Sequence, residues 1–185
     1  MSPDLARAAT EELLAAAGFW LDKVDPDRQR VVDAAVGALV ADLDSPALRE
    51  LAGLYGDEPS DTLDGLARQT AQELGLPEPT AEDAVRIDLK NRCQTVLDGT
   101  ASPRTVTAWA YDLDVPRTPG PRRFPLLDPF IKIEHTYDYL EDLRGYADEA
   151  KVDRAHIDLD IARLDVEVRD EALKLLDHRS GNGPR

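Results

Sequence analysis

Serine or aspartate directly followed by proline recurs along the first 113 residues and constrains the fold more than any other feature. The four pairs are Ser2-Pro3, Asp25-Pro26, Ser45-Pro46 and Ser102-Pro103. Ser or Asp before a helix accepts a hydrogen bond from its first turn, and Pro fits that turn because its missing N–H has no helical partner there. The pattern predicts a run of short helices in residues 1–113.

Apolar residues between these start signals recur at steps of three and four, which is typical of helices with one buried face. The clearest stripe consists of Val32, Val36, Leu39 and Leu43. Gly18 and Gly99 are expected to end their helices, since glycine readily adopts the left-handed conformation of a C-terminal cap. Thr80 followed by Asp83 resembles a capping box at the start of a further helix.

The composition changes between Asp114 and Pro129, where five prolines exclude a continuous helix. We expect residues 114–129 to form an extended connector and residues 130–178 to form a helical hairpin. The second helix of the hairpin is predicted from the spacing of Ile161, Leu164, Val168, Ala172 and Leu175. Short strands at 130–133 and 157–161 are left open, because apolar residues there also alternate.

The fold predicted from these patterns is all-α, with about eight helices in a single domain over residues 1–178. That domain consists of a bundle of short helices (1–113), the proline-rich connector (114–129) and the hairpin (130–178). The polar, glycine-containing tail at residues 179–185 is expected to be disordered.

Acidic residues outnumber basic ones by 37 to 22, which gives a formal net charge of −15. A field of this sign repels nucleic acid and anionic membrane surfaces, so neither is expected as a partner. The charge indicates either a surface shaped for a basic protein partner or a solvated acidic surface with no partner.

A single cysteine, Cys93, is consistent with a reducing compartment, because it cannot form an internal disulfide. It falls on an apolar stripe beside Val96 and Leu97, so we expect a buried thiol without catalytic function. No apolar run approaches the length of a membrane helix, and the N-terminal residues are not those of a signal peptide. A cytoplasmic location is therefore expected.

No nucleotide-binding glycine loop, nucleophile elbow or Cys/His zinc spacing is present, so no cofactor and no catalytic residue is predicted. The most suggestive local cluster is Glu134, His135 and Asp138. These residues can share one side of a helix and begin a divalent metal site. They are the candidates for a metal-binding or metal-dependent enzymatic function.

The C-terminal region offers candidate protein-binding residues. Carboxylates are dense there, and Tyr139 falls off the apolar stripe, so an exposed tyrosine beside acidic side chains is expected, as at an interface hot spot. The candidates are Tyr139, Asp158, Asp160, Asp165 and Glu167. The alternative is a solvated helix face, since these acids alternate with Arg163, Arg169 and Lys174.

Two phrases of the sequence are similar to phrases of small acidic helical bacterial proteins. The first runs from Ser102-Pro103-Arg104 to Trp109-Ala110, and the second is Asp165-Val166-Glu167-Val168-Arg169-Asp170-Glu171-Ala172. Some of those proteins resemble immunity proteins of toxin systems. The resemblance implies an interaction role and assigns no functional residue.

Three functions follow as hypotheses. The first is a non-enzymatic module that binds a basic protein partner, in the manner of an immunity-type inhibitor. The second is a metal-binding protein or metal-dependent enzyme that uses the Glu134, His135 and Asp138 cluster. The third is a structural homodimer in which the long C-terminal helix pairs with itself.

Overall fold

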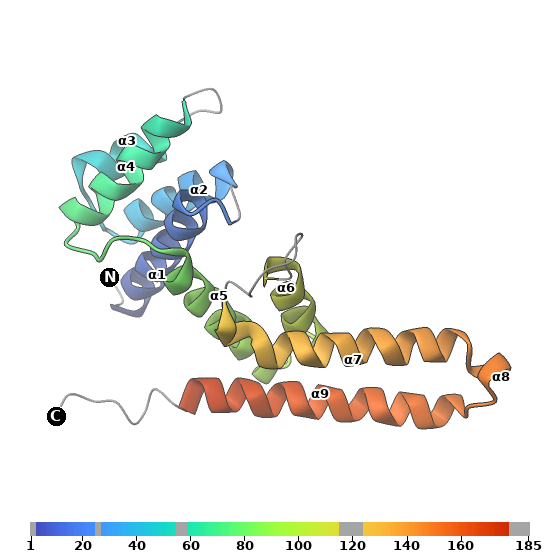
Figure 1. Cartoon of the computed structure of the whole chain (residues 1–185). Coiled ribbons are helices and arrows are strands. Elements are labelled where there is room, and N and C mark those ends of the chain that lie inside the picture. The colour runs from blue at the N-terminus through green and yellow to red at the C-terminus, as the bar shows by residue number, and fades with distance from the viewer. Residues whose placement is uncertain (1–2, 25–26, 55–58, 115–123, 178–185) are drawn as a thin grey trace. The chain divides into compact units, whose positions relative to one another are not determined.

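The computed structural model describes residues 3–24, 27–54, 59–114 and 124–177 (Figure 1). Its regular elements in these ranges are all helical, with no strand, so the all-α prediction is confirmed. The strand alternatives at 130–133 and 157–161 are resolved as helix. The predicted tail at 179–185 and the central part of the predicted connector lie outside the described residues.

The helices follow one another with short connections. In chain order they are α1 (Pro3–Leu21), α2 (Arg28–Val40), α3 (Pro46–Ala52), α4 (Ser60–Glu73), α5 (Ala81–Leu97), α6 (Arg104–Asp114), the 3₁₀ turn η1 (Pro125–Leu127), α7 (Asp128–Gly145), α8 (Ala147–Ala150) and α9 (Arg154–Asp177). None of the described helices combines the length and apolar character needed to cross a bilayer.

The chain divides into two compact units, residues 1–88 and residues 89–185. The division falls inside α5, which begins in the first unit and ends in the second. The interpretation of residues 1–178 as a single domain remains a prediction, and the connector is not where the units divide.

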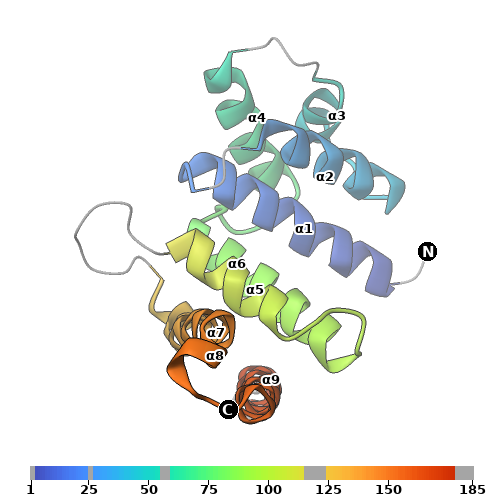
Figure 2. The same ribbon diagram turned by 90° about the vertical axis from the view of Figure 1, so that its right-hand side faces the viewer.

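In the first unit, α1 packs on α2, α2 on α3, and α3 on α4 (Figure 2). The core is rich in alanine, which allows close approach of the helices. Its buried residues are Leu13, Ala16, Trp20, Val31, Val32, Ala34, Ala35, Ala38, Ala47, Leu48, Leu51, Leu63 and Leu66. The indole N–H of Trp20 donates to Asp64 at 2.6 Å and ties α1 to α4.

The buried face of α2 differs from the predicted stripe. Val31, Ala35 and Ala38 are fully buried, whereas Val36 is 44% exposed and Leu43 lies beyond the end of the helix. The prediction at Val36 was wrong because large apolar residues were taken to mark the core. Here alanines occupy the packed face of α2, and a valine is left on the outside.

Gly18 lies inside α1 and does not end it, contrary to prediction. A Cβ atom at Gly18 would lie 2.3 Å from the carbonyl oxygen of Thr80 and 3.2 Å from Cβ of Ala84. Glycine is therefore needed for close packing of α1 against the start of α5. Gly99, in contrast, has a φ of +73° just after α5, as expected of a helix stop.

Side chains cap α2, α3 and α5 of the first unit. Ser45 accepts from the N–H of Leu48 at 3.1 Å, as its Ser-Pro pair predicts. The pair Asp25-Pro26 lies outside the described residues, and the residue that caps α2 is Asp27, which accepts from the N–H of Arg30 at 3.2 Å. The predicted capping box is present in part, since Thr80 accepts from the N–H of Asp83 at 3.2 Å.

In the second unit, α6 and α9 both pack on α7, and α7 and α9 run side by side as a hairpin (Figures 1 and 2). The hairpin prediction is consistent with this arrangement. Tyr137 is 1% exposed at its centre. Other buried residues of this unit are Leu89, Cys93, Val96, Val106, Ala110, Phe124, Leu127, Phe130, Ile131, Ile133, Ile157, Leu164, Val168 and Ala172.

The described end of the connector is not extended. Residues 125–127 form η1, and α7 begins at Asp128 with Pro129 in its first turn, where proline is tolerated. The backbone N–H of Phe124 donates to the buried carboxylate of Asp114 at 2.9 Å. This hydrogen bond ties the start of η1 to the end of α6.

Candidate protein-binding surface

The three residues predicted as a metal cluster do not converge. Glu134 is buried, and it accepts hydrogen bonds from the Thr107 hydroxyl and from Nε of Arg104, the latter at 3.2 Å. Asp138 accepts from Nη2 of the same arginine at 2.7 Å. His135 is exposed, and its ring meets the ring of Tyr111 edge-on at 5.3 Å between centroids.

A cation therefore already lies among these carboxylates. Arg104 in α6 pairs with Glu134, Asp138 and Glu141 of α7, and its guanidinium lies 5.4 Å from the ring centroid of Tyr137. Hydrogen bonding to Glu141 is the largest cause of the raised pKa of Arg104. Within the described part of the chain, no group of three or more His, Cys, Asp or Glu side chains is arranged to hold a metal ion.

Tyr137 extends the same network to α9. Its hydroxyl donates to Asp165 at 2.6 Å. Burial, followed by this hydrogen bond, raises the pKa of Tyr137 far above its ordinary value of 10.0. Asp165, predicted to bind a partner, is thus engaged in holding α9 to α7.

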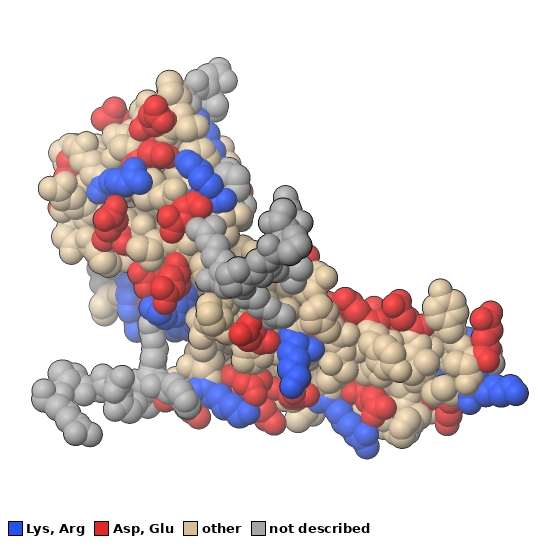
Figure 3. All heavy atoms as spheres, viewed as in Figure 1, with Lys and Arg blue, Asp and Glu red and all other residues tan. Residues whose placement is uncertain are grey.

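The other predicted binding residues lie at the surface of the hairpin. Tyr139 is 64% exposed, and Glu167 is exposed. Asp158 pairs with Arg144 at 3.1 Å and Asp160 pairs with Arg163 at 2.6 Å. Charges of both signs alternate on the side of the hairpin that Figure 3 presents. This surface is therefore largely neutralised by its own ion pairs.

The strongest concentration of unbalanced negative charge is in the first unit. Residues 1–88 contain 19 acidic and seven basic residues, whereas residues 89–185 contain 18 and 15. The first unit therefore carries most of the net charge of −15.

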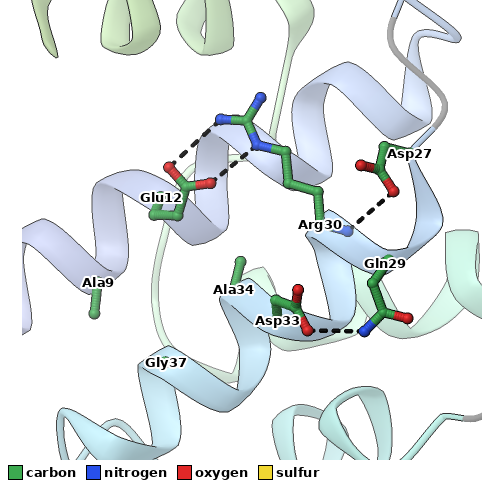
Figure 4. A pocket seen from close by; sticks show the side chains of 8 residues that line it. All are labelled: Ala9, Glu12, Asp27, Gln29, Arg30, Asp33, Ala34 and Gly37. Atoms are coloured by element: carbon green, nitrogen blue, oxygen red, sulfur yellow. Dashed lines mark hydrogen bonds and ion pairs between the residues drawn. The ribbon is translucent and has the colours of Figure 1, made fainter.

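A hollow of about 460 Å³ lies between α1 and α2 of this unit (Figure 4). Small residues leave space in it, and carboxylates surround that space. The lining residues are Ala9, Glu12, Asp27, Gln29, Arg30, Asp33, Ala34 and Gly37. Asp27 and Asp33 are exposed, and the side chain of Glu12 is 44% exposed, so these carboxylates are accessible to a ligand.

Among the described residues that line this hollow, the cation is Arg30, and it is already held by acids. Its Nη2 and Nη1 donate to the two oxygens of Asp88 at 2.8 and 3.1 Å, and its Nε donates to Glu12 at 2.9 Å. Burial alone would lower the pKa of Arg30, but the hydrogen bonds to Asp88 and Glu12 outweigh it and raise that pKa. The hollow therefore stays negative despite the arginine.

Asp33 accepts a hydrogen bond from the amide of Gln29 at 2.8 Å, and Asp27 caps α2. Both side chains are thus oriented by their own helix at the edge of the hollow (Figure 4). Sequence reasoning missed this site, because Glu12, Arg30 and Asp88 are far apart in the chain. One local feature could have indicated the site. Ala34 and Gly37 are small side chains on α2, and the buried residues Ala35 and Ala38 of the same helix are small as well.

Comparisons of the chain with protein-family models, with curated proteins and with solved structures find no match.

Proposed function

We propose that this protein is a binding module whose N-terminal unit receives a basic segment of a partner protein. The observation that carries the proposal is the hollow between α1 and α2, which carboxylates surround and in which the lining cation is already paired with Glu12 and Asp88. A further cation is therefore the group that this site attracts.

A lysine or arginine side chain matches both parts of the hollow. Its methylene stem can cover the small apolar surface of Ala9, Ala34 and Gly37, while its charged head reaches the carboxylates. Hydrogen bonds between a guanidinium or ammonium and a carboxylate are stronger than those between neutral groups. Arg30 pairs with Glu12 and Asp88, whereas its guanidinium does not pair with the lining carboxylates Asp27 and Asp33. These two are therefore the carboxylates that we propose to bind the incoming cation.

The excess of negative charge over residues 1–88 adds long-range attraction for a basic partner. Such complementarity raises the rate of association and makes it depend on ionic strength. An immunity-type inhibitor, which covers the basic surface of a partner and so blocks its activity, is the form of this function that we propose.

The test uses defined peptides as probes. A short arginine- and lysine-rich peptide, an acidic peptide of equal length and a neutral one are titrated into the full chain by calorimetry and by amide NMR. We expect binding of the basic peptide alone, with shifts in the amides of α1 and α2. The affinity should fall as salt is added.

The matched variants change charge without changing shape. Asp27→Asn with Asp33→Asn removes two charges, yet asparagine still caps a helix and still accepts the Gln29 hydrogen bond. The control, Glu50→Gln with Asp61→Asn, removes two charges from exposed positions in α3 and α4. Weaker binding by both variants in equal measure would mean that net charge, and not this hollow, attracts the peptide.

A further inference from the structure

Helix α9 is apolar on two opposite faces. One face carries Ile157, Leu164, Val168 and Ala172, which are buried. The other carries Leu159, Val166 and Leu173, which are 59%, 56% and 48% exposed. A surface helix of a folded protein normally has one apolar stripe, so the second needs an explanation.

The exposed residues are spaced seven apart, and Ala162 lies between the first two. Leu159, Ala162, Val166 and Leu173 are called the outer stripe from here on. In a helix, apolar residues repeated at this interval form the seam of a coiled coil. Leu159, Val166 and Leu173 then take the a positions, and the d positions are Ala162, Arg169 and Leu176. A shallow hollow of about 480 Å³ lies over this stripe, lined by Leu159, Ala162, Arg163, Val166, Glu167 and Asp170.

We infer that the outer stripe pairs with the same stripe of a second copy of this chain, with the two α9 helices antiparallel. In this register Leu159 faces Leu176 of the second copy, Ala162 faces Leu173, and Val166 faces Arg169. Both halves of the seam are identical by symmetry, as in an isologous dimer. The seam, from Leu159 to Leu176, is about 26 Å long at a rise of about 1.5 Å per residue.

The charges beside the seam favour this arrangement. Arg163 and Asp170 lie at the flanking e positions of the stripe. In the antiparallel register Arg163 of each copy lies beside Asp170 of the other copy. Two ion pairs between the copies can therefore form. Flanking charges of this kind set the partner and the orientation of coiled-coil helices.

A parallel arrangement is disfavoured by Arg169. It would place Arg169 opposite Arg169 of the second copy within the seam. Like charges there oppose that pairing. The antiparallel register instead sets each Arg169 against Val166, where its methylene stem can pack.

This dimer is independent of the proposed function, because its seam is on α9 and the proposed site lies between α1 and α2. Either proposal can be wrong while the other is correct. Loss of peptide binding with an intact dimer would reject only the first, and the reverse result would reject only the second.

Sedimentation of the full chain from micromolar to near-millimolar concentration is the first test. We expect a monomer–dimer equilibrium, and we expect Leu159→Glu to raise its dissociation constant about tenfold or more, since it places a charge against Leu176 of the second copy. Val40→Glu is the control, because Val40 is 74% exposed on α2. A monomer at every concentration, or a dimer that Leu159→Glu leaves unchanged, overturns the inference.

A charge exchange tests the register. Asp170→Arg places arginines side by side across the seam and should weaken the dimer, and adding Arg163→Asp should restore it. Failure of the second change to restore the dimer overturns the antiparallel register.

Cross-linking gives a second readout of direction. Ala162→Cys and Leu173→Cys are made separately, mixed and oxidised, while the native Cys93 is buried. The antiparallel seam predicts that disulfides join one variant to the other. A predominance of Ala162→Cys pairs would show parallel helices and overturn the inference.

Discussion

Arg30 of α2 and Asp88 of α5 form a bidentate ion pair at 2.8 and 3.1 Å, 58 positions apart in the sequence. The Asp88 side chain is 9% exposed and that of Arg30 is 24% exposed. The pair joins the second helix of the first unit to the helix that ends it. Removing the acid leaves a partly buried guanidinium with Glu12 as its remaining carboxylate in the pairs described for it.

Asp88→Ala should therefore lower the free energy of unfolding by about 2 kcal/mol, the usual cost of losing a hydrogen bond to a charged partner. Chemical denaturation followed by circular dichroism measures it. Glu82→Ala, which breaks the exposed pair with Arg86 on the same helix, should cost about 0.5 kcal/mol or less. Equal effects of the two substitutions would contradict the structural importance of the Arg30–Asp88 pair.

Gly18→Ala should destabilise the first unit by about 1–3 kcal/mol or more, because its new Cβ would meet the backbone of Thr80. Backbone atoms cannot move aside as a flexible side chain can. Gly65→Ala is the matched control, since Gly65 lies within α4 and a Cβ there meets nothing within 4 Å. That control should stabilise the protein by about 0.5–1 kcal/mol. Thermal unfolding of both variants measures these changes in stability. A Gly18→Ala variant as stable as the unsubstituted protein would disprove the close packing of α1 against Thr80.

Glu73 predicts a pH dependence of stability. The N–H of Ala47 donates to its carboxylate at 2.9 Å and Gln69 adds a second hydrogen bond, which together lower the pKa of Glu73 below its ordinary value of 4.5. The stabilisation is then present above pH 4.5 and is lost as the pH falls through the lowered pKa of the folded state. Glu73→Gln should flatten this part of the pH profile of unfolding. Profiles of equal slope for both proteins would refute the prediction.

Cys93 should be unreactive in the folded protein. Burial raises the pKa of its thiol to about 12, so almost no thiolate is present near neutral pH. A chromogenic disulfide reagent should label Cys93 slowly without denaturant and completely in its presence. Fast labelling of the native protein would show that the second unit opens readily around α5.

Local signals were sufficient for the helices and insufficient for the site. The Ser45-Pro46 pair marks a helix start because capping involves neighbours in the chain. The Ser102-Pro103 pair lies directly before α6, which begins at Arg104. The hollow between α1 and α2 depends instead on which small residues of two helices face each other, and spacing within one helix does not determine that. Val36 illustrates the limit, since its size indicated the core while Ala35 occupies it.

The candidate cluster in α7 shows the same limit for charges. Glu134, His135 and Asp138 are close in sequence, but the packing of α6 places Arg104 against the two acids and Tyr111 against the histidine. A distant arginine thus changed the chemistry that the local pattern indicated. Likewise, Asp165 was predicted to lie on a protein-binding surface, whereas its carboxylate accepts a hydrogen bond from the Tyr137 hydroxyl.

The continuity of α5 determines how the protein can be dissected. Val85 lies in the part of this helix that belongs to the first unit, and Cys93 lies in the part that belongs to the second; both are buried. Truncation of the chain after residue 88 would leave Asp88 at a frayed helix end. Its ion pair with Arg30 would then be weaker. An N-terminal fragment should instead extend through Gly99, so that the whole helix is retained. A fragment lacking α5 altogether would lose the carboxylate that neutralises Arg30 beside the proposed binding site.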